Sequence, residues 1–268
     1  MVISVDFKKI MGNASPLWGI CPFGRLSSKL LPCRAKSRIP ENAKSVIVCC
    51  FPYLLGEEEY KNSNVSKYAV VTDYHEVALS RLNRACNELK NLFPNEEFAA
   101  FADNSAIPEV EAACIAGLGK RGKNSLLITE KYGSYVFIGE IVTTLEIPCT
   151  ENEISPCIQC GKCIRSCPSG ALSESGFKKE KCLSEITQKK GELSAEETAL
   201  LKACGCAWGC DICQDVCPMN KNAGKTEIAE FLNSAHPVVT EDTPLENRAY
   251  EWRGKKVIDR NINILKGE

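Results

Sequence analysis

The sequence predicts a mixed α/β (α+β) domain followed by a smaller cysteine-rich domain. Apolar, β-branched runs alternate with amphipathic segments across the first 150 residues, which is typical of a sheet covered by helices. Regularly spaced cysteines then follow between positions 157 and 217. We therefore expect three parts: an α/β domain at 1–150, a cysteine domain at 151–222, and a C-terminal tail at 223–268 that packs on the core.

The strands of the first domain are predicted from short apolar runs. Residues 44–51, KSVIVCCF, are continuous and β-branched, as in a strand buried on both faces. Further strands are expected at 97–102, 125–129 and 135–145.

Two helices are expected between these strands. Residues 74–93 place apolar side chains at helical spacing, and Asp73 is suited to cap the first turn. Pro108 can open a second helix and Gly117 can close it. A further helix is expected around 194–203, inside the cysteine region.

The cysteine region holds two related motifs. Cys157, Cys160, Cys163 and Cys167 have the spacing C-x2-C-x2-C-x3-C-P, the bacterial ferredoxin run in which the fourth cysteine ligates the other cluster. Cys210, Cys213 and Cys217 repeat the last two gaps and also precede a proline. Cross-ligation then groups Cys157, Cys160, Cys163 and Cys217, and leaves Cys167, Cys210 and Cys213 one ligand short.

The missing ligand has three candidates. A perfect repeat would place it at position 207, which is Ala207. A short loop could return Cys182 to the side of Cys167, so Cys182 is the preferred ligand, with Cys204 and Cys206 as alternatives. We expect two 4Fe–4S clusters rather than zinc, which rarely uses this spacing, or disulfides, which suit small secreted chains.

Composition narrows the remaining choices. The net charge is −1, so no global field directs the chain to nucleic acid. The longest apolar run, 46–55, is too short to span a bilayer, and the N-terminus shows no secretory pattern. These features and 17 cysteines predict a cytoplasmic protein that does not enter the membrane. No dinucleotide or phosphate-loop motif is present.

Four segments in order resemble the epoxyqueuosine reductase family. They are YAVVTDYHEVALSR (68–81), FADNSAIPEVEAACIAGLGKRGKNSLLI (101–128), GSYVFIGEIVT (133–143), and the cysteine region ending in CDICQDVCPMNK. The tail motif RGKKVIDRNINIL is also similar to the family's end. In that family the fourth ligand of the second cluster lies between the two runs, which matches Cys182.

The resemblance implies an activity and its cofactors. The family reduces the epoxide of epoxyqueuosine in tRNA to queuosine, using cobalamin beside two 4Fe–4S clusters, and it is related to the corrinoid reductive dehalogenases. The first domain would then bind cobalamin, and the clusters would pass it electrons from a donor such as ferredoxin or flavodoxin. The alternatives are a corrinoid reductase of another substrate, or a two-cluster electron carrier without cobalamin.

The resemblance also implies site residues. Asp103 would be the proton donor, with a pKa raised by burial beside the corrin. Asp73, Tyr74 and His75 match the family's DYH and would line the cofactor pocket, with Asp73 also able to cap the helix. A second set of cofactor-binding candidates follows from the matched glycine-rich segments: Gly119, Gly122, Lys123, Asn124 and Ser134. For the glycines, a tight turn without a ligand is the alternative.

Two departures from the family concern substrate recognition. The segment before Ser45 is short and lacks clear family motifs, and no helical-repeat domain follows the cysteine region. The tRNA substrate is therefore an expectation from resemblance. Basic residues near the motifs could line a tRNA path or dock an acidic electron carrier: Lys120, Arg121, Lys162, Arg165, Lys178, Lys179 and Lys181.

Overall fold

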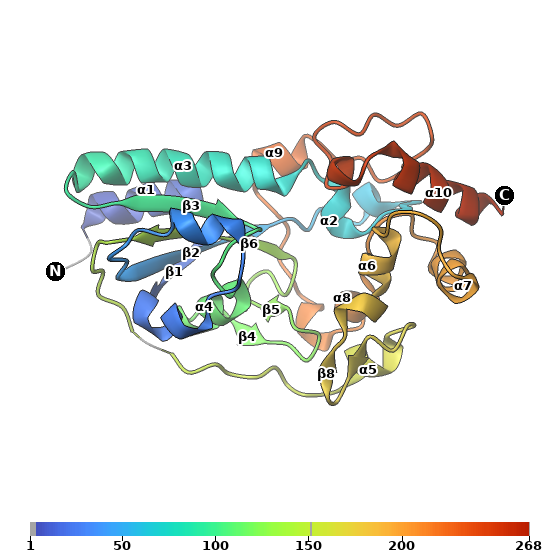
Figure 1. Ribbon diagram of the computed structural model, residues 1–268, viewed down its shortest axis with the longest axis horizontal. Helices are drawn as coiled ribbons and strands as arrows, with labels where there is room; N and C mark the ends of the chain where they lie inside the picture. The colour runs from blue at the N-terminus through green and yellow to red at the C-terminus, as the bar shows by residue number, and fades with distance from the viewer. Residues whose placement is uncertain (1–3, 151, 268) are drawn as a thin grey trace.

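A four-stranded antiparallel sheet forms the first part of the molecule. The computed structural model describes residues 4–150 and 152–267. The sheet has the order β1-β2-β6-β3 (Figure 1). Its strands are β1 (Leu17–Pro22), β2 (Ser45–Pro52), β6 (Val136–Thr143) and β3 (Phe98–Ala102). The predicted mixed fold is confirmed, and because every pairing in this sheet is antiparallel, it is of the α+β kind.

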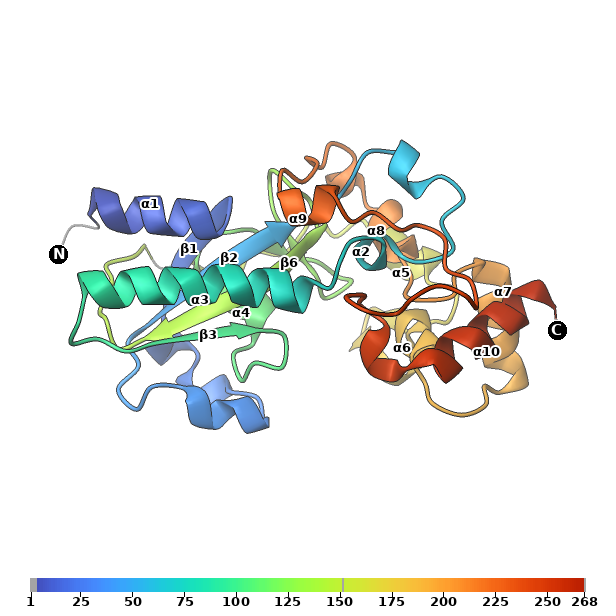
Figure 2. The same cartoon turned by 90° about the horizontal axis from the view of Figure 1, so that it is seen from above.

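Helices cover both faces of this sheet. Helices α1 (Val5–Ala14) and α3 (Tyr74–Leu92) lie on one face, and α4 (Glu109–Ile115) lies on the other (Figures 1 and 2). Alternate residues of β2 enter the two cores: Ile47 belongs to the α3 side and Val48 to the α4 side. The continuous apolar run at 44–51 is therefore explained by burial on both faces.

Small elements connect the sheet to the cysteine region. Helix α2 (Lys67–Val70) precedes α3, and the hairpin of β4 (Lys120–Arg121) and β5 (Leu127–Ile128) follows α4. The strand expected at 125–129 is thus only two residues long. Ser125, with a φ of 66°, turns the chain just before it.

The cysteine region consists of short helices and one further hairpin. In chain order these are α5 (Lys162–Ser166), β7 (Leu172–Ser173), β8 (Gly176–Phe177), α6 (Leu183–Thr187), α7 (Ala195–Cys204) and α8 (Ile212–Asp215). Helix α7 is the helix expected at 194–203. It starts at a capping box in which Ser194 and Glu197 satisfy each other's backbone N–H groups.

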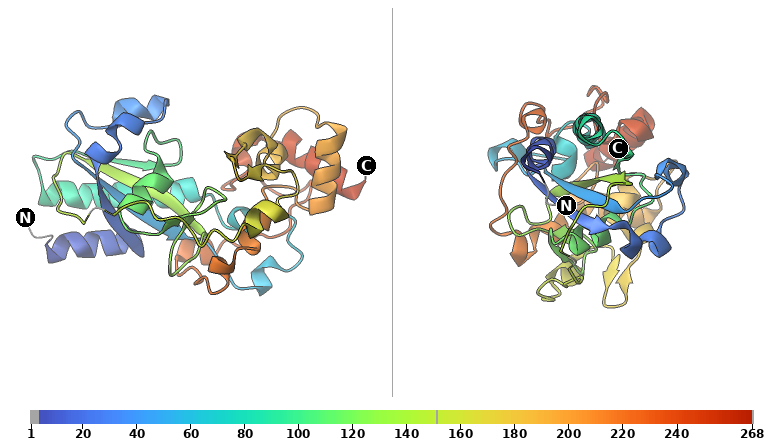
Figure 3. Two further views of the ribbon diagram at one scale, coloured as in Figure 1. Left: turned by 90° about the horizontal axis from the view of Figure 1, so that it is seen from below. Right: turned by 90° about the vertical axis from the view of Figure 1, so that its left-hand side faces the viewer.

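The C-terminal residues fold back along the cysteine region. Helix α9 (Ala229–Leu232) is followed by α10 (Lys255–Lys266), which lies beside α7 (Figure 3). Tyr250 packs edge-on against the buried Trp208, with ring centroids 5.9 Å apart. Among the described residues, no helix has the length and apolar character needed to cross a bilayer.

Candidate active site

Two adjoining cavities lie between the sheet and the cysteine region. The inner cavity has a volume of about 410 Å³, and the outer cavity has a volume of about 690 Å³. Tyr68 and Phe137 line both, so the two spaces meet at these rings. The inner cavity reaches the cysteines, whereas the outer cavity reaches Asp103 and His75. The two groups of predicted site residues therefore line neighbouring cavities that share the Tyr68 and Phe137 rings.

The cysteines fall into two sets in space. Burial raises the pKa of the Cys163 thiol, and the neighbouring Cys157 and Cys217 thiols add to this effect. Burial likewise raises the pKa of Cys182, with smaller contributions from Cys210 and Cys167. The structure thus brings Cys163 close to Cys157 and Cys217, and Cys182 close to Cys167 and Cys210.

The second set faces the inner cavity. Its four members all line this space: Cys167, Cys182, Cys210 and Cys213. Cys204 also lies close to Cys210 and raises its pKa, but neither Cys204 nor Cys206 lines the cavity. The Cys206 Sγ donates instead to the carbonyl of Trp208 at 3.1 Å. Only Cys182, among the three candidates, therefore shares the open space of the other thiols.

The first set lies nearer the surface. Cys160 is exposed, as is the adjacent Ile158, with 58% of its surface accessible. Lys162 and Arg165 are exposed on α5 beside them. This set is accessible from solvent, whereas the second set faces inwards.

The loop around Cys167 favours a thiolate. Burial raises the pKa of this thiol, but the backbone of Leu172 and the Ser169 hydroxyl outweigh burial and lower the pKa overall. Among the residues described, no three His, Cys, Asp or Glu side chains converge on a point that suits one metal ion. A 4Fe–4S cluster places its four thiolates on four different irons, so its ligands surround a larger volume.

His75 connects two carboxylates at the outer cavity. Asp73 accepts from the backbone N–H of His75 at 3.0 Å, which confirms Asp73 as the cap of α3. The Nδ1 of His75 lies 2.6 Å from the same carboxylate oxygen, and its Nε2 lies 3.1 Å from Asp103 Oδ2. Asp103 follows directly after the end of β3, so the sheet and α3 together set this geometry.

The proton of this cluster resides on His75. Burial lowers the pKa of the imidazole, but hydrogen bonds to Asp103 and Asp73 outweigh burial and raise the pKa to about 9. The hydrogen bond from His75 in turn lowers the pKa of Asp103. Burial raises the pKa of Asp103 here as well, but the side chain is 59% exposed and the hydrogen bond from His75 outweighs burial, so a rise beside the corrin stays a prediction. At neutral pH the pair is an imidazolium and a carboxylate.

The Asp103 loop has an unusual backbone. Asp103 and Asn104 have φ values of 50° and 37°, in the left-handed region that non-glycine residues seldom adopt. Two such residues in sequence turn the chain sharply at the end of β3. The turn directs the Asp103 carboxylate back towards His75 on the neighbouring helix.

Aromatic rings form one wall of the outer cavity. The Tyr74 ring stacks on Phe137 with a centroid separation of 4.0 Å and an interplanar angle of 4°, and it also stacks on His75. Burial raises the pKa of Tyr74, so its hydroxyl is neutral throughout the physiological range. The cavity therefore has a flat, uncharged wall between the thiols and the carboxylates.

Two further carboxyl groups lie close to Asp103, the half-buried Glu109 and the fully buried Glu140. Burial, together with the Asp103 charge, raises the pKa of Glu109 to about 8. Glu140, on the central strand β6, is fully buried, and neither of its carboxyl oxygens has a hydrogen-bond partner within the described chain. Burial and the nearby Glu109 raise its pKa well above the usual value, so both groups are neutral at pH 7.

The candidates in the glycine-rich segments separate into two groups. Asn124 and Ser134 are buried and line the inner cavity. Gly119, Gly122 and Lys123 line neither cavity. A Cβ at Gly119 would lie 2.4 Å from the Ile128 carbonyl oxygen, so this glycine allows β4 to approach β5.

Gly122 and Lys123 have structural contacts of their own. A Cβ at Gly122 would lie 2.2 Å from Asn124 Oδ1, so a larger residue here would displace the Asn124 side chain. Lys123 forms an ion pair of 2.6 Å with Glu174 in the cysteine region. The turn thereby positions Asn124 at the inner cavity.

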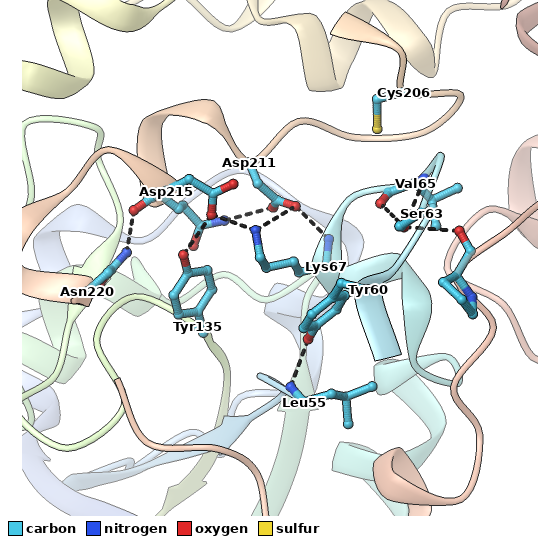
Figure 4. Close-up of polar contacts among 12 residues, drawn as sticks. Leu55, Tyr60, Ser63, Val65, Lys67, Tyr135, Cys206, Asp211, Asp215 and Asn220 are labelled. Carbon is cyan, nitrogen blue, oxygen red and sulfur yellow. Dashed lines mark hydrogen bonds and ion pairs between the residues drawn. The ribbon is translucent and has the colours of Figure 1, made fainter. Parts of the chain in front are cut away.

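A polar cluster joins the cysteine region to the sheet domain. The backbone N–H of Lys67 donates to Asp211 Oδ2 at 2.6 Å, and its ammonium group donates to Asp215 Oδ1 at 2.6 Å (Figure 4). The Tyr135 hydroxyl donates to the same Asp215 oxygen at 2.8 Å. Asp211 and Asp215 flank Cys213, so these contacts fix the second thiol set relative to the sheet.

Comparison with known proteins identifies the family. The model "4Fe-4S double cluster binding domain" matches residues 156–220, and "Epoxyqueuosine reductase QueG, DUF1730" matches 34–104. An epoxyqueuosine reductase of Lactococcus garvieae is 32% identical over 83% of this chain and 68% of its own length. The chain belongs to the epoxyqueuosine reductase family. The two 4Fe–4S clusters expected from cysteine spacing are confirmed by the double-cluster match.

Other epoxyqueuosine reductases agree with this placement. The Cyclobacterium marinum protein is 31% identical over 86% of this chain and 79% of its own length. The structure of the Streptococcus thermophilus protein matches with a TM-score of 0.80, 26% identity, and coverage of 99% of this chain and 81% of that one. A crystal structure of an epoxyqueuosine reductase with a tRNA-Tyr epoxyqueuosine-modified stem loop has the same fold, with a TM-score of 0.80, 24% identity, and coverage of 97% and 80%.

The lengths of the relatives differ from that of this chain. It spans 68, 62 and 54% of the first three curated epoxyqueuosine reductases, from Lactococcus garvieae, Bacillus anthracis and Listeria monocytogenes.

Several residues at the candidate site were not found by sequence reasoning. Gln188 and Trp252 line the outer cavity, but they lie far from the motifs in sequence and belong to no recognisable pattern. Phe137 lies inside a predicted strand, where an aromatic residue indicates only packing. Glu109 was assigned to the start of a helix, where a carboxylate has an ordinary structural explanation.

Proposed function

We propose that this protein reduces the epoxide of epoxyqueuosine in tRNA, using cobalamin in the paired cavities and electrons from two 4Fe–4S clusters. The observation that supports this most directly is the pair of neighbouring cavities, one lined by the second thiol set and the other by the Asp103–His75 pair. One end can deliver electrons and the other can deliver a proton. An epoxide placed between them would have both within reach.

The ligand assignment follows from the two thiol sets. Cys157, Cys160, Cys163 and Cys217 would hold the outer cluster, and Cys167, Cys182, Cys210 and Cys213 the inner one. The exposed Cys160 makes the outer cluster the point where a small electron carrier, such as ferredoxin or flavodoxin, docks. Exposed Lys162 and Arg165 suit an acidic carrier.

The cavities suit a large, flat cofactor. Their walls are aromatic at Tyr68, Tyr74 and Phe137, and polar at the buried Asn124 and Ser134. Ser134 is held in place by its own contacts, because its N–H donates to Asn220 at 2.8 Å and its hydroxyl donates to Gln214 at 2.9 Å. Cobalamin, when bound, supplies a strongly reducing cobalt centre beside the inner cluster.

The reaction consumes two electrons and two protons. Removing the epoxide oxygen breaks two C–O bonds, leaves a carbon–carbon double bond and releases water. The leaving oxygen needs a proton because an alkoxide is a poor leaving group at neutral pH. His75 carries a proton 3.1 Å from Asp103, and transfer through Asp103 would bring it to the exposed carboxylate that faces the outer cavity. Asp103 is therefore the proposed acid, and His75 recharges it.

The substrate also indicates where the protein acts. A tRNA substrate and a chain with 17 cysteines both suit the reducing cytoplasm.

The first experiment is an anaerobic titration of cobalamin into cluster-reconstituted protein, followed by its visible spectrum. A saturable spectral change is expected. Binding would be followed by incubation with an epoxyqueuosine-containing stem-loop RNA and dithionite, with mass spectrometry to detect the loss of one oxygen atom.

Two variants test the acid. Asp103→Asn should abolish turnover while leaving iron content and cobalamin binding unchanged. Asp6→Asn, on the exposed first turn of α1, is the matched control and should retain full activity. Intact clusters with no cobalamin binding would refute the proposal and favour an electron carrier. Full activity of Asp103→Asn would remove the acid role alone.

A further inference from the structure

An exposed tryptophan lies at the rim of the outer cavity. Trp252 is 60% exposed, and it lines the same cavity as Asp103 and His75. The guanidinium carbon of Arg253 lies 3.8 Å above the centroid of its ring. A single exposed aromatic ring is ordinary on a protein surface, so it is the position of Trp252 at the cavity, beside Arg253, that makes it a candidate binding group.

A basic pocket adjoins this rim. It has a volume of about 440 Å³ and is lined by five cationic residues and one acidic residue, Glu192: the cations are Lys190, Arg253, Lys255, Lys256 and Arg260. Two chain segments pass from the outer cavity directly into this pocket. Gln188 lines the cavity and Lys190 the pocket, and Trp252 lines the cavity and Arg253 the pocket.

The pocket is held in shape by α10. The Arg260 guanidinium donates to the carbonyl of Lys189 at 2.6 Å and also to that of Gly191. The buried Asn261 side chain donates to the carbonyls of Thr187 and Ala207, both at 2.7 Å. These bonds fix the 187–191 loop against the helix, so the basic groups on both sides keep their spacing without a ligand.

Some of the positive charge is free to bind an anion. Lys255 is engaged with Asp259 at 3.0 Å and with the carbonyl of Glu241. Lys190 and Lys256 are exposed and face the same pocket. The start of α10 also lines the pocket, at Gly254, Lys255 and Lys256, and it has no side-chain cap. Phosphate is the anion that best suits several cations beside a helix start.

We propose that this rim binds the single-stranded loop of the RNA substrate: Trp252 stacks on a base next to the modified nucleotide, and the basic pocket holds a backbone phosphate. The inference rests on the proposed function, because the modified base must occupy the outer cavity. Stacking on aromatic rings and contacts to phosphate are the usual means of binding unpaired RNA. Trp252 and Arg253 are consecutive, so one can contact a base while the other contacts a neighbouring phosphate. This arrangement suits RNA, in which bases and phosphates lie a short distance apart.

The test measures binding of a fluorescently labelled, unmodified anticodon stem-loop RNA by anisotropy, over a series of salt concentrations. Trp252→Ala should weaken binding about tenfold, with Trp252→Phe in between, because removing one stacking partner has an effect of this size. The double variant Lys190→Ala/Lys256→Ala should weaken binding and make the salt dependence shallower, by about 0.7 in log–log slope for each phosphate that is no longer neutralised. Lys8→Ala/Lys9→Ala, an equal charge change on exposed positions of α1, is the control and should change neither.

Turnover with dithionite separates this inference from the proposed function. Trp252→Ala should raise KM for the modified stem-loop and leave kcat nearly unchanged, with iron content and cobalamin binding as in the parent protein. If Trp252→Ala and the double lysine variant bind RNA as tightly as the parent, the rim proposal is wrong even where the parent turns over. If the parent binds and does not reduce the RNA, the proposed function fails and the rim remains an RNA site. A defect seen only with a protein electron donor would overturn the proposal and assign the rim to the electron carrier.

Discussion

The charge state of His75 gives the sharpest test of the candidate site. Its pKa is raised from 6.5 to about 9 because Asp103 and Asp73 both accept from its ring. The chain has only two histidines, and burial together with Arg248 lowers the pKa of the other, His236. The two titrations should therefore be well separated in the same sample.

The energetic consequence has a definite sign. A histidine whose pKa is raised on folding stabilises the native state fully below the unfolded pKa, and this contribution is lost as pH rises through the folded pKa. The interval is therefore from pH 6.5 to about 9. The difference between these values corresponds to about 3 kcal/mol in the absence of solvent screening. Because the His75 and Asp103 side chains are 33% and 59% exposed, we expect roughly 1–2 kcal/mol in practice.

The assay is nuclear magnetic resonance of protein labelled at histidine, with the clusters oxidised, from pH 5 to pH 10. Asp103→Asn and Asp73→Asn should each lower the pKa of His75 by more than one pH unit. The second substitution retains a helix cap, because an asparagine side chain can accept the same backbone N–H. Chemical denaturation at pH 6.5 and 9.5 measures the accompanying loss of stability. A His75 that titrates near 6.5 in the parent protein would refute the imidazolium–carboxylate pair and the proton delivery built on it.

Three other predictions concern the clusters and the fold. Cys182→Ser should lose about four irons per chain on anaerobic reconstitution while Cys204→Ser retains all of them; the reverse result, measured by iron analysis, would transfer the ligand role to Cys204. Lys67→Met leaves Asp211 without its cation, so we expect the free energy of unfolding, measured with denaturant, to fall by about 3 kcal/mol. An unchanged midpoint would show that the polar cluster in Figure 4 contributes little to stability. Gly119→Ala places a Cβ 2.4 Å from the Ile128 carbonyl oxygen, so the melting temperature should fall by several degrees. An unaltered melting temperature would mean that β4 and β5 can move apart without loss of stability.

Sequence reasoning succeeded where spacing is a direct consequence of chemistry. A cubane cluster needs four thiolates at fixed separations, so the cysteine runs predict it without knowledge of the surrounding fold. The strand at 44–51 was predicted for a similar reason, because burial on both faces requires a continuous apolar run. The N-terminal strand β1 was missed because its sequence, LWGICP, contains a glycine and a proline that normally interrupt strands.

Contacts between site residues that are distant in sequence could not be predicted from spacing or from apolar patterning. His75 and Asp103 are 28 positions apart, and their contact depends on a left-handed turn at Asp103 and Asn104 that non-glycine residues do not signal. The pKa of Asp103 was therefore expected to rise, when a neighbouring cation lowers it. Trp252 lies in a polar C-terminal segment, and nothing in that segment indicates a site. Its position at the outer cavity depends on the fold, which brings the C-terminal residues back to the cavity.

In the proposed function, electrons and protons would reach the substrate from different groups of residues. The first thiol set is exposed at Cys160, whereas the second set is half-buried and lines the inner cavity beside aromatic rings. The nearby Glu109 and Glu140 both have raised pKa values and are neutral at pH 7, so they add no negative charge that would oppose electron arrival at the cavity. The Asp103–His75 pair is ionised, and it also holds a transferable proton. In the proposed reaction, a reduced centre in this space would meet that proton source where the epoxide oxygen leaves.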